Sequence, residues 1–497
     1  MTSIPTTENN TSSTNIATCL ADNISIMTER LTGCDDIKKR TMFLGGDSHV
    51  EACIYYVEVA INNMTLEESV IGKLIGRLMN MTKDEMYVFL KDNALGITDV
   101  NELSTIEEAL MGIMVGEGVI FIDGYDKAIK IKSKGYPMMG VSASESEKAL
   151  RGSREGFCDA LKANTALLRK RVRNHKLKVN ERIMGSLTKT TVALVYVDSL
   201  ARPAILDEIN KRLDKLEGSI EFLTDSGIIE QLTEESEYSP FPQYQTTERP
   251  DRAAMALMEG RIILFVDNSP TALILPTSYN SFFKTADDYF LRYHVASLAR
   301  IIRYIAAFLA VTLPGIYVAA MTYHPEIIPE KLLLTLYDAR ATVPFSVVIE
   351  VLIMELSFEL LREAGIRVPG PMGNTIGIVG GLIIGQSAVS AGIVSPIIVV
   401  IVALTALSSF AIPSEELAGT FRVLKYLMII SGYILGLFGL IAGWLLILTH
   451  LSRMSSFGFP YLTPGVSRDI FINPKDSLIR FPMKFIKWKS LFRKSQQ

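Results

Sequence analysis

The chain changes character near residue 300, and this change limits what it can fold into. Before that point the sequence is charged and mixed, whereas long apolar runs follow it. Residues 304–323 form a stretch of 20 without Asp, Glu, Lys or Arg, and residues 426–449 form another of 24. A helix needs about 20 apolar residues to cross the hydrocarbon core of a bilayer. We therefore expect an integral membrane protein with a large soluble region in front.

Composition narrows the remaining choices. A length of 497 residues is enough for two or three domains. The four cysteines are scattered and form no CxxC pair, which favours a reducing compartment. The five histidines show no metal-ligand spacing, so we expect no metal or other cofactor. The net charge of −3 averages two different regions, and we expect no nucleic-acid partner.

The first 23 residues are rich in Ser, Thr and Asn and lack the basic and apolar regions of a signal peptide. Such a composition is typical of a disordered tail, which we assign to residues 1–23. Without an export signal, the soluble region is expected to stay in the cytoplasm.

Segments typical of helices and strands alternate over residues 24–297. Residues 51–59 (EACIYYVEV) and 191–197 (TVALVYV) are rich in β-branched and aromatic residues and are predicted to be buried strands. Residues 66–79 and 203–216 have helical spacing, and the second segment begins with a proline, which suits a first helical turn.

Two predicted hairpins, at 118–132 and 261–276, resemble each other. FIDG in the first matches FVDN in the second, about 140 residues later, and a Glu-Gly pair precedes both. One interpretation is a duplication that gives two soluble α/β subdomains, at 24–140 and 150–297. The other is that apolar strands followed by Asp-containing turns resemble one another by chance.

Positive charges set the predicted orientation of the membrane half, residues 298–450. Arg292, Arg300 and Arg303 precede the first span, which places that end in the cytoplasm. The tail at 451–497 holds nine Lys or Arg against two Asp and is also expected to be cytoplasmic. Both ends inside require an even number of crossings, most simply four plus a half-helix, whereas five would put one end outside. The predicted fold class is thus α+β with a membrane part, an α/β region of two subdomains followed by a multi-pass helical domain.

The end of the tail, residues 481–494 (FPMKFIKWKSLFRK), interleaves aromatic with basic residues. This pattern suits a helix or strand on an anionic membrane surface, so we expect contact with membrane lipid. A specific lipid or partner site is the alternative.

Several glutamates interrupt the second apolar stretch. At 100° per residue, Glu355, Glu359, Arg362 and Glu363 share one helix face, and Glu350 points roughly the other way. A carboxylate in lipid is costly unless it is paired or faces water. One interpretation is a polar strip that lines an ion path or a protomer interface, because a ring of glutamates in an oligomer favours cations. The other is an interfacial helix with solvated carboxylates.

Residues 371–414 contain no Asp, Glu, Lys or Arg and are rich in glycine at their start. Small residues permit close helix contact in lipid, and a broken or re-entrant segment is also possible there. The segment adds three residues to the candidates for a pore or interface: Gly381, Gly385 and Gln386.

The soluble region contains no catalytic motif such as GxSxG, a P-loop or HExxH, so we do not expect an enzyme. RGSREGF at 151–157 is a basic turn that favours an interdomain salt-bridge network over an anion site. FPQYQTTERPD at 241–251 is predicted to be a linker that enters a helix and is fixed by ion pairs. The candidates for coupling or structural roles are Arg151, Arg154, Glu155, Glu248, Arg249, Asp251, Glu259, Arg261 and Asp267.

These motifs resemble the GerA family, the A subunits of spore germination receptors. The resemblance covers about residues 25–490 and rests on RGSREGF at 151–157, FPQYQTTERPD at 241–251, EGR at 259–261, VDNSP at 266–270 and MELSFELLREAGIR at 354–367. The glycine-rich segment and the basic tail follow in the expected order. Asn268 stands where the family usually has glycine, and because Asn tolerates positive φ, we expect the turn to be kept.

The resemblance implies a protein of the spore inner membrane that acts with a transporter-like B subunit and a lipoprotein C subunit. It implies a subunit that oligomerises into an ion channel, opens on nutrient binding and so triggers germination. An alternative is a nutrient-binding or transport component whose soluble domain binds the germinant.

Overall fold

The computed structural model describes two compact units of this chain. The first contains Met1–Glu234, Thr246–Pro276 and Trp488–Gln497, and the second contains Glu235–Gln245 and Thr277–Lys487. The residues described are 14–44, 50–60, 85, 100–131, 135, 147, 152–217, 220–223, 225–227, 229, 238–367, 380–381, 385–463, 479–482 and 492–493. The predicted helix at 66–79, Arg151 and most of the glycine-rich segment at 371–385 lie outside these residues.

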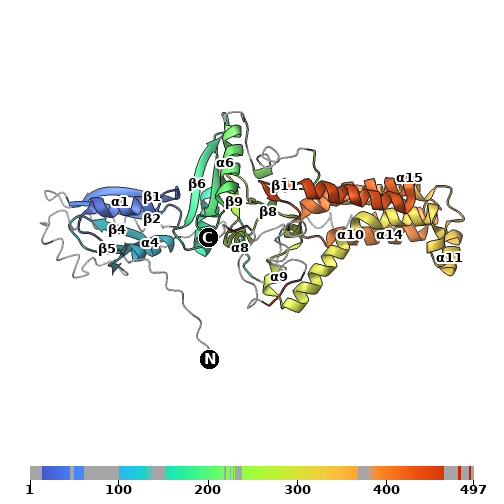
Figure 1. The fold of residues 1–497 in the computed structure, drawn as a ribbon, viewed down its shortest axis with the longest axis horizontal. Helices are drawn as coiled ribbons and strands as arrows, with labels where there is room; N and C mark the ends of the chain where they lie inside the picture. The colour runs from blue at the N-terminus through green and yellow to red at the C-terminus, as the bar shows by residue number, and fades with distance from the viewer. Residues whose placement is uncertain are drawn as a thin grey trace, which may run out of the picture. The chain divides into compact units, whose positions relative to one another are not determined.

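The first unit contains two five-stranded sheets with the same strand order. Figure 1 shows the first sheet in blue to cyan and the second in green. The first sheet has the order β1-β2-β4-β5-β3 and the second β6-β7-β9-β10-β8. The strands of the first are β1 (Ile37–Leu44), β2 (Val50–Val57), β3 (Val100–Leu103), β4 (Gly118–Ile122) and β5 (Ala128–Ile131). Those of the second are β6 (Leu177–Met184), β7 (Thr190–Val197), β8 (Gln245–Thr247), β9 (Ile262–Val266) and β10 (Ala272–Leu275).

Strand register is the same in both sheets. Ile37 lies opposite Val57 in the first, and Leu177 opposite Val197 in the second, each 140 positions further on. The β4–β5 and β9–β10 hairpins also match, because Gly118 pairs with Ile131 and Ile262 with Leu275. The predicted strands and both predicted hairpins are confirmed. Since a register slip of one residue would turn every side chain over, this agreement supports duplication rather than chance.

Two helices cover one face of each sheet. They are α1 (Leu20–Arg30) and α4 (Ile106–Met114) in the first repeat, and α5 (Leu161–Arg171) and α8 (Pro250–Met258) in the second. Alternate strand residues point toward them: Cys53, Tyr55 and Val57 in the first core, and Ala193, Val195 and Val197 in the second. A further helix, α6 (Pro203–Glu217), confirms the helix predicted at 203–216.

The same aspartate begins a helix in both repeats. A carboxylate oxygen of Asp123 accepts a hydrogen bond from the Leu20 amide at 3.1 Å, and Asp267 does so for Leu161 at 3.1 Å. Each aspartate satisfies an amide that the first helical turn leaves without a partner. Asn268, which follows the second aspartate, has φ +65, so the predicted left-handed turn is confirmed.

An asymmetric ion pair joins the two repeats. Arg169 of α5 is fully buried and donates from Nε and Nη2 to Asp36 at 2.5 and 2.8 Å. Beside it, the turn after α1 pairs with the edge strand β6, where the Asp35 amide donates to the Val179 carbonyl at 2.9 Å. In α1 the position equivalent to Arg169 is Thr28, so only the second repeat supplies this cation.

The predicted boundaries need correction at two places. Residues 14–23 are not a tail, because Ile16 is buried and Asn15 bridges to Thr105. The second repeat does not extend to residue 297, since Thr277–Lys487 belongs to the second unit.

Helices dominate the second unit. Its long elements are α10 (Tyr293–Tyr323), α11 (Glu330–Arg340), α12 (Val347–Arg367), α14 (Pro396–Phe410) and α15 (Glu415–Arg453). The short ones are η2 (Tyr279–Phe283), α9 (Asp287–Phe290), η3 (Pro325–Ile327), β11 (Ser455–Ser456) and β12 (Phe459–Pro460). Among the described residues, α10 and α15 are long and apolar enough to cross a membrane.

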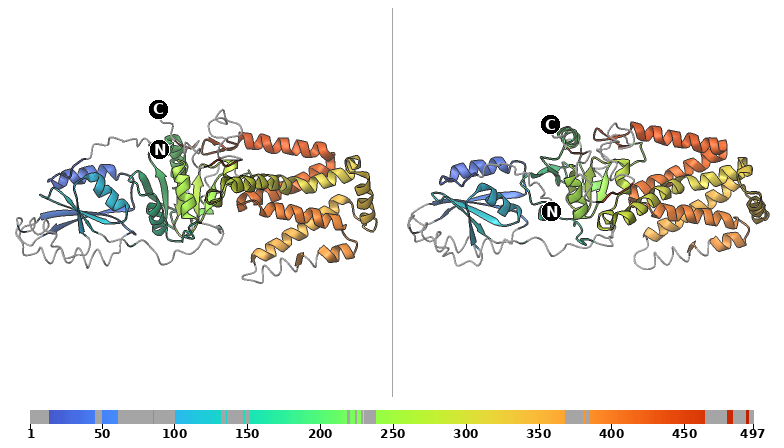
Figure 2. Two further views of the ribbon diagram at one scale, coloured as in Figure 1. Left: turned by 90° about the horizontal axis from the view of Figure 1, so that it is seen from below. Right: turned by 60° about the horizontal axis from the view of Figure 1, so that its bottom comes forward.

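Helix α15 folds back on itself at Gly436, which has φ 58 and ψ −140. A Cβ on Gly443 would lie 2.7 Å from the Met428 sulfur. In a straight helix these two residues would be about 22 Å apart along the axis, so the chain must reverse between them. Figure 2 shows the two arms meeting at one end of the bundle. The prediction of one continuous span over 426–449 is therefore wrong.

Glycines bring α10 and α15 into close contact. A Cβ on Gly315 would lie 2.8 Å from the Met428 carbonyl oxygen, and one on Gly432 would lie 2.8 Å from the Gly315 carbonyl oxygen. Nearby, the Trp444 indole donates to the Thr312 hydroxyl at 3.1 Å. Close backbone packing of this kind is how apolar helices associate where the hydrophobic effect is absent.

We predict that Gly436→Ala destabilises the helical unit by about 1–3 kcal/mol, because alanine rarely adopts this backbone conformation. A Cβ at this position would also lie 2.9 Å from the His324 ring. Thermal unfolding of the purified protein in detergent measures the effect. Gly381→Ala is the matched control, since its Cβ would meet no atom within 4 Å. Equal melting temperatures for the two variants would contradict the assigned reversal.

Candidate functional site: the glutamates of α12 and their partners

The glutamates of α12 lie on different faces of the helix, as their spacing predicts, and so contact different partners. Glu350 is fully buried and accepts hydrogen bonds from Arg340 at 3.0 and 2.8 Å and from the Ser395 amide at 3.0 Å. It therefore ties the end of α11 and the start of α14 to the first turn of α12.

Glu355 forms the most buried ion pair of this helix. Its Oε2 lies 2.5 Å from Nζ of Lys425 in the first arm of α15, and the two side chains are 1% and 6% exposed. The other oxygen of Glu355 is buried without a hydrogen-bond partner among the described residues. The interpretation of α12 as an interfacial helix with solvated carboxylates is therefore wrong for Glu350 and Glu355.

One turn further along, Glu359 lies 3.4 Å from Arg422 and 3.9 Å from Arg362. Since Arg422 and Lys425 are three residues apart and Glu359 and Glu355 are four apart, the two helices run antiparallel with a ladder of opposite charges between them. Glu363 does not belong to this ladder, because it is 55% exposed and pairs with Arg367 of its own helix.

A small cavity adjoins the ladder. Its volume is about 10 Å³, and its lining includes Glu359, Arg422, Lys425, Thr405 and Ser409. This is roughly the least space that holds one water molecule. The described conformation thus offers a pocket about the size of one water molecule between α12, α14 and α15, rather than an open passage.

The glycine-rich candidates lie near α14 but outside the charge ladder. Gly385 is buried, and a Cβ on it would lie 3.5 Å from Val399. Gly381 and Gln386 are exposed. Residues 385–390 are helical, and the structure does not bring these three positions onto the glutamates.

The ion pairs of the basic turn lie within the second repeat. Glu155 contacts Lys170 at 2.5 Å and Arg171 at 2.6 Å, both in the last turn of α5, and Arg154 is exposed. Among the described residues of this turn, Glu155 therefore pairs within its own repeat and not across the two domains. Sequence reasoning missed two ion pairs that join the repeats, Arg169 with Asp36 and Lys162 with Glu58.

The predicted linker into a helix is confirmed, and Arg249 fixes its geometry. Arg249 is buried and donates two hydrogen bonds to the Asp251 carboxylate, of 3.0 and 2.6 Å. Pro250 is the first residue of α8, and the Glu248 carbonyl accepts from the Phe157 amide at 2.7 Å. The basic turn at the start of the second repeat thus meets the linker that enters α8.

Glu259 and Arg261 follow α8 and form an ion pair of 3.2 Å. Arg261 also places its guanidinium 4.2 Å from the ring centroid of Phe492 in the tail. Phe492 is buried, so this part of the tail is not free for the membrane surface that its composition predicts.

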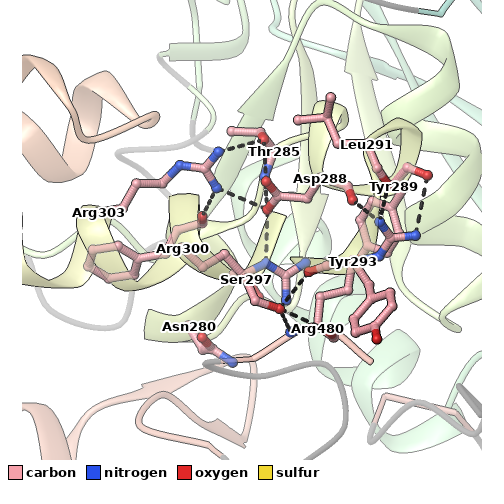
Figure 3. Close-up of polar contacts among 12 residues, drawn as sticks. Asn280, Thr285, Asp288, Tyr289, Leu291, Tyr293, Ser297, Arg300, Arg303 and Arg480 are labelled. Carbon is pink, nitrogen blue, oxygen red and sulfur yellow. Dashed lines mark hydrogen bonds and ion pairs between the residues drawn. The ribbon is translucent and has the colours of Figure 1, made fainter. Parts of the chain in front are cut away.

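Sequence reasoning also missed a buried cluster at the start of α10 (Figure 3). Asp288 accepts from Arg300 and Arg303, each at 2.9 Å, and Arg480 of the tail donates to carbonyls of α9. Burial alone would raise the pKa of Asp288, but hydrogen bonds from Arg303 and Arg300 outweigh it and hold the pKa below its ordinary value. From the sequence, Arg300 and Arg303 indicate only the orientation of the first apolar helix, and their pairing with Asp288 is not predicted.

No group of three or more His, Cys, Asp or Glu side chains suited to a metal occurs among the residues that the structure places. What the α12 site offers is charge: carboxylates and ammonium or guanidinium groups within an apolar bundle. Such groups stabilise ions or hold helices together by Coulomb attraction.

Comparison with known proteins identifies the family. The family described as "Bacillus/Clostridium GerA spore germination protein" matches residues 25–491. The chain belongs to the GerA family. Among GerA relatives it is 36% identical to spore germination protein KA of Bacillus subtilis, over 94% of this chain and 85% of that protein. It is 35% identical to spore germination protein A1 of the same organism, over 93% and 94%.

Two further similarities complete the comparison of this GerA-family chain. It is 39% identical to the uncharacterised membrane protein YfkQ of B. subtilis, over 93% of this chain and 88% of that protein. A crystal structure of the N-terminal domain of the A subunit of the Bacillus megaterium germinant receptor GerK3 matches 54% of this chain and 98% of that one, with 23% identity and a TM-score of 0.40.

We predict that Glu355→Leu and Lys425→Met each destabilise the protein by about 3–5 kcal/mol, because each leaves an uncompensated buried charge. The double variant should recover most of the loss, since it removes both charges. Thermal unfolding in detergent measures this cycle. Glu363→Gln, at the exposed pair, should change stability by less than about 1 kcal/mol. Additive losses in the double variant would contradict a direct pair.

We predict that Arg249→Ala loosens the second repeat by about 1–3 kcal/mol, because it strips two hydrogen bonds from the nearly buried Asp251. Protein abundance in spores and thermal unfolding report the loss. Arg182→Ala, which breaks an exposed pair with Asp214, is the matched control. Normal abundance together with lost signalling would point instead to a direct role of Arg249 in coupling.

Proposed function

We propose that this chain is the A subunit of a nutrient germinant receptor in the spore inner membrane. In this proposal it converts nutrient binding by the receptor into ion release, which triggers germination. Its partners are a transporter-like B subunit and a lipoprotein C subunit. Family membership over nearly the whole chain supports the germination role.

The proposed means is an oligomeric ion channel that crosses the membrane several times, with the soluble unit and the tail on the cytoplasmic side. The observation that carries it is the buried Glu355–Lys425 pair in an apolar bundle. If these helices needed only to pack together, apolar residues at these positions would give a more stable bundle, because desolvating two charges costs several kcal/mol. Charges kept at such a cost within a membrane usually serve ions or protons.

The ladder of charges also suggests how the channel stays closed. With Lys425 on Glu355 and Arg422 near Glu359, the negative potential that would attract a cation is cancelled. If α12 moves away from the first arm of α15 and water enters, two carboxylates per protomer face the new space. A ring of these carboxylates then favours cations over anions.

We predict nutrient-gated cation flux when the purified chain is placed in liposomes with its two partner subunits. Glu359→Gln should lower the flux about tenfold, the factor that corresponds to ~1.4 kcal/mol of lost cation stabilisation. Glu363→Gln is the matched control outside the ladder. A charge swap, Glu355→Lys with Lys425→Glu, keeps the pair but moves the carboxylate off α12.

The swap separates two roles. If the pair only holds the helices together, the swapped protein conducts normally, and the proposal that Glu355 lines the path is wrong. Flux that is absent in every preparation, with nutrient bound by the soluble unit, would favour a nutrient-binding component instead.

A further inference from the structure

The C-terminal end of α8 forms a cradle that holds the last described residues of the chain. The last carbonyls of a helix have no partner within the helix. The backbone amides of Gly260 and Arg261 donate hydrogen bonds to the carbonyls of Leu257 and Ala256, respectively. The next carbonyl, that of Met258, instead accepts two hydrogen bonds from Arg493, at 2.9 Å from Nε and 2.5 Å from Nη2.

Gly260 makes the close approach of the tail possible. Its φ of +85 is a conformation that suits glycine at a helix end. A Cβ there would lie 2.8 Å from the Leu200 carbonyl oxygen and 2.9 Å from Cα of Arg493. Any larger residue would push the tail away from the helix end.

Two arginines complete the cradle around the dipeptide Phe492-Arg493. Arg261 stacks over the Phe492 ring at 4.2 Å, a cation–π contact. Arg202 donates from Nε to the Arg493 carbonyl at 3.0 Å. The cradle therefore contacts the aromatic ring, the guanidinium and the backbone of the dipeptide, each through a different group.

The duplication supplies an internal comparison. The equivalent helix end in the first repeat also has a glycine at positive φ, Gly116 with φ +88. The residue after it is Glu117, which is buried and lies 3.4 Å from Lys130, where the second repeat has Arg261. Glu117 cannot form a cation–π contact, so the cradle is a property of the second repeat.

The second unit holds the tail at a different residue, Arg480 (Figure 3). Its guanidinium donates to the carbonyls of Asp288 and Leu291 at the end of α9 and lies 5.6 Å from the Tyr289 ring. The Ser297 hydroxyl of α10 accepts from the Arg480 amide at 3.1 Å. Arg480 is 3% exposed, so this contact is as enclosed as a core residue.

We propose that the C-terminal tail is a strap, docked through Phe492-Arg493 in the α8 cradle and through Arg480 on the α9–α10 corner. Each anchor is built from residues of its own unit. Both guanidiniums bind carbonyl oxygens of the protein. Through its two anchors the tail connects the second repeat to the first apolar helix, and this connection does not depend on whether the helices conduct ions.

Cross-linking in spore membranes tests the docking without reference to ion flow. The full chain, with its four native cysteines replaced by alanine, carries Ser199→Cys and Leu491→Cys, next to Leu200 and Phe492, so that every cradle contact stays in place, and is treated with a short bis-maleimide. We expect a link within one chain, identified by mass spectrometry of the joined peptides. Adding Arg493→Ala should lower the yield, and Lys494→Ala, which removes a neighbouring positive charge, should leave it unchanged. A yield insensitive to Arg493→Ala, or links found between two chains, would overturn the proposal.

Nutrient-triggered ion release from spores tests the strap's role in coupling. In the native-cysteine chain we expect Arg493→Ala to slow release by at least about fivefold at normal protein abundance, the lower range of coupling between distant sites. Phe492→Ala should act in the same direction, and Arg493→Lys should restore only part of the rate, because lysine lacks the planar fork. Lys494→Ala should release ions normally. Normal release in both Arg493→Ala and Phe492→Ala spores would overturn the role in coupling even if the cross-link forms.

Discussion

In the described part of the helical unit, each of the three buried carboxylates meets a cation, and this requirement sets how the helices are placed. Asp288 meets Arg300 and Arg303, Glu350 meets Arg340, and Glu355 meets Lys425. Apolar side chains alone would allow the helices to slide by a turn at little cost, because lipid and leucine are equally apolar. An ion pair allows no such slide, since a shift of one turn strands two charges. The register of α12 against α11 and α15 is therefore set by a few polar contacts inside an otherwise apolar surface.

In the soluble unit, duplication accounts for the shared architecture of the two repeats. A few residues that differ between the copies determine which contacts each repeat makes with the rest of the chain. Both repeats keep the strand register and the aspartate that begins a helix. They differ where each meets the rest of the chain. Arg169 occurs only in the second repeat and reaches Asp36 of the first, and Arg261 replaces a glutamate where the tail docks.

Local patterns predicted the parts of the fold that local physics decides. The β-branched runs, the Asp-Asn turn and the proline at a helix start each identify their element, because the signal and the structure span the same few residues. The separate faces of Glu350 and Glu355 followed from helical spacing in the same way. The partners of these glutamates could not be predicted from the sequence. Lys425 lies 70 residues from Glu355, and only the packed bundle brings the two together.

Two errors have a common origin in composition. The run at 426–449 is apolar throughout, so its length suggested one span, and the turn at Gly436 was hidden among other glycines. The tail is basic and aromatic, so it suggested a membrane surface, yet Arg480 and Arg493 bind carbonyls. Composition reports which environment a segment tolerates, whereas the partner it finds depends on geometry that only the fold supplies.

The junction between the repeats has a consequence for how many such modules can stack. The first repeat inserts an acidic turn, Asp35-Asp36, beside the edge strand of the second. The equivalent turn of the second repeat carries His175-Lys176, and the equivalent edge strand of the first carries Lys38 and Lys39. A further module added by the same operation would bring like charges together, which is unfavourable. The charges therefore favour the junction of the first repeat with the second and disfavour the same junction with a further module.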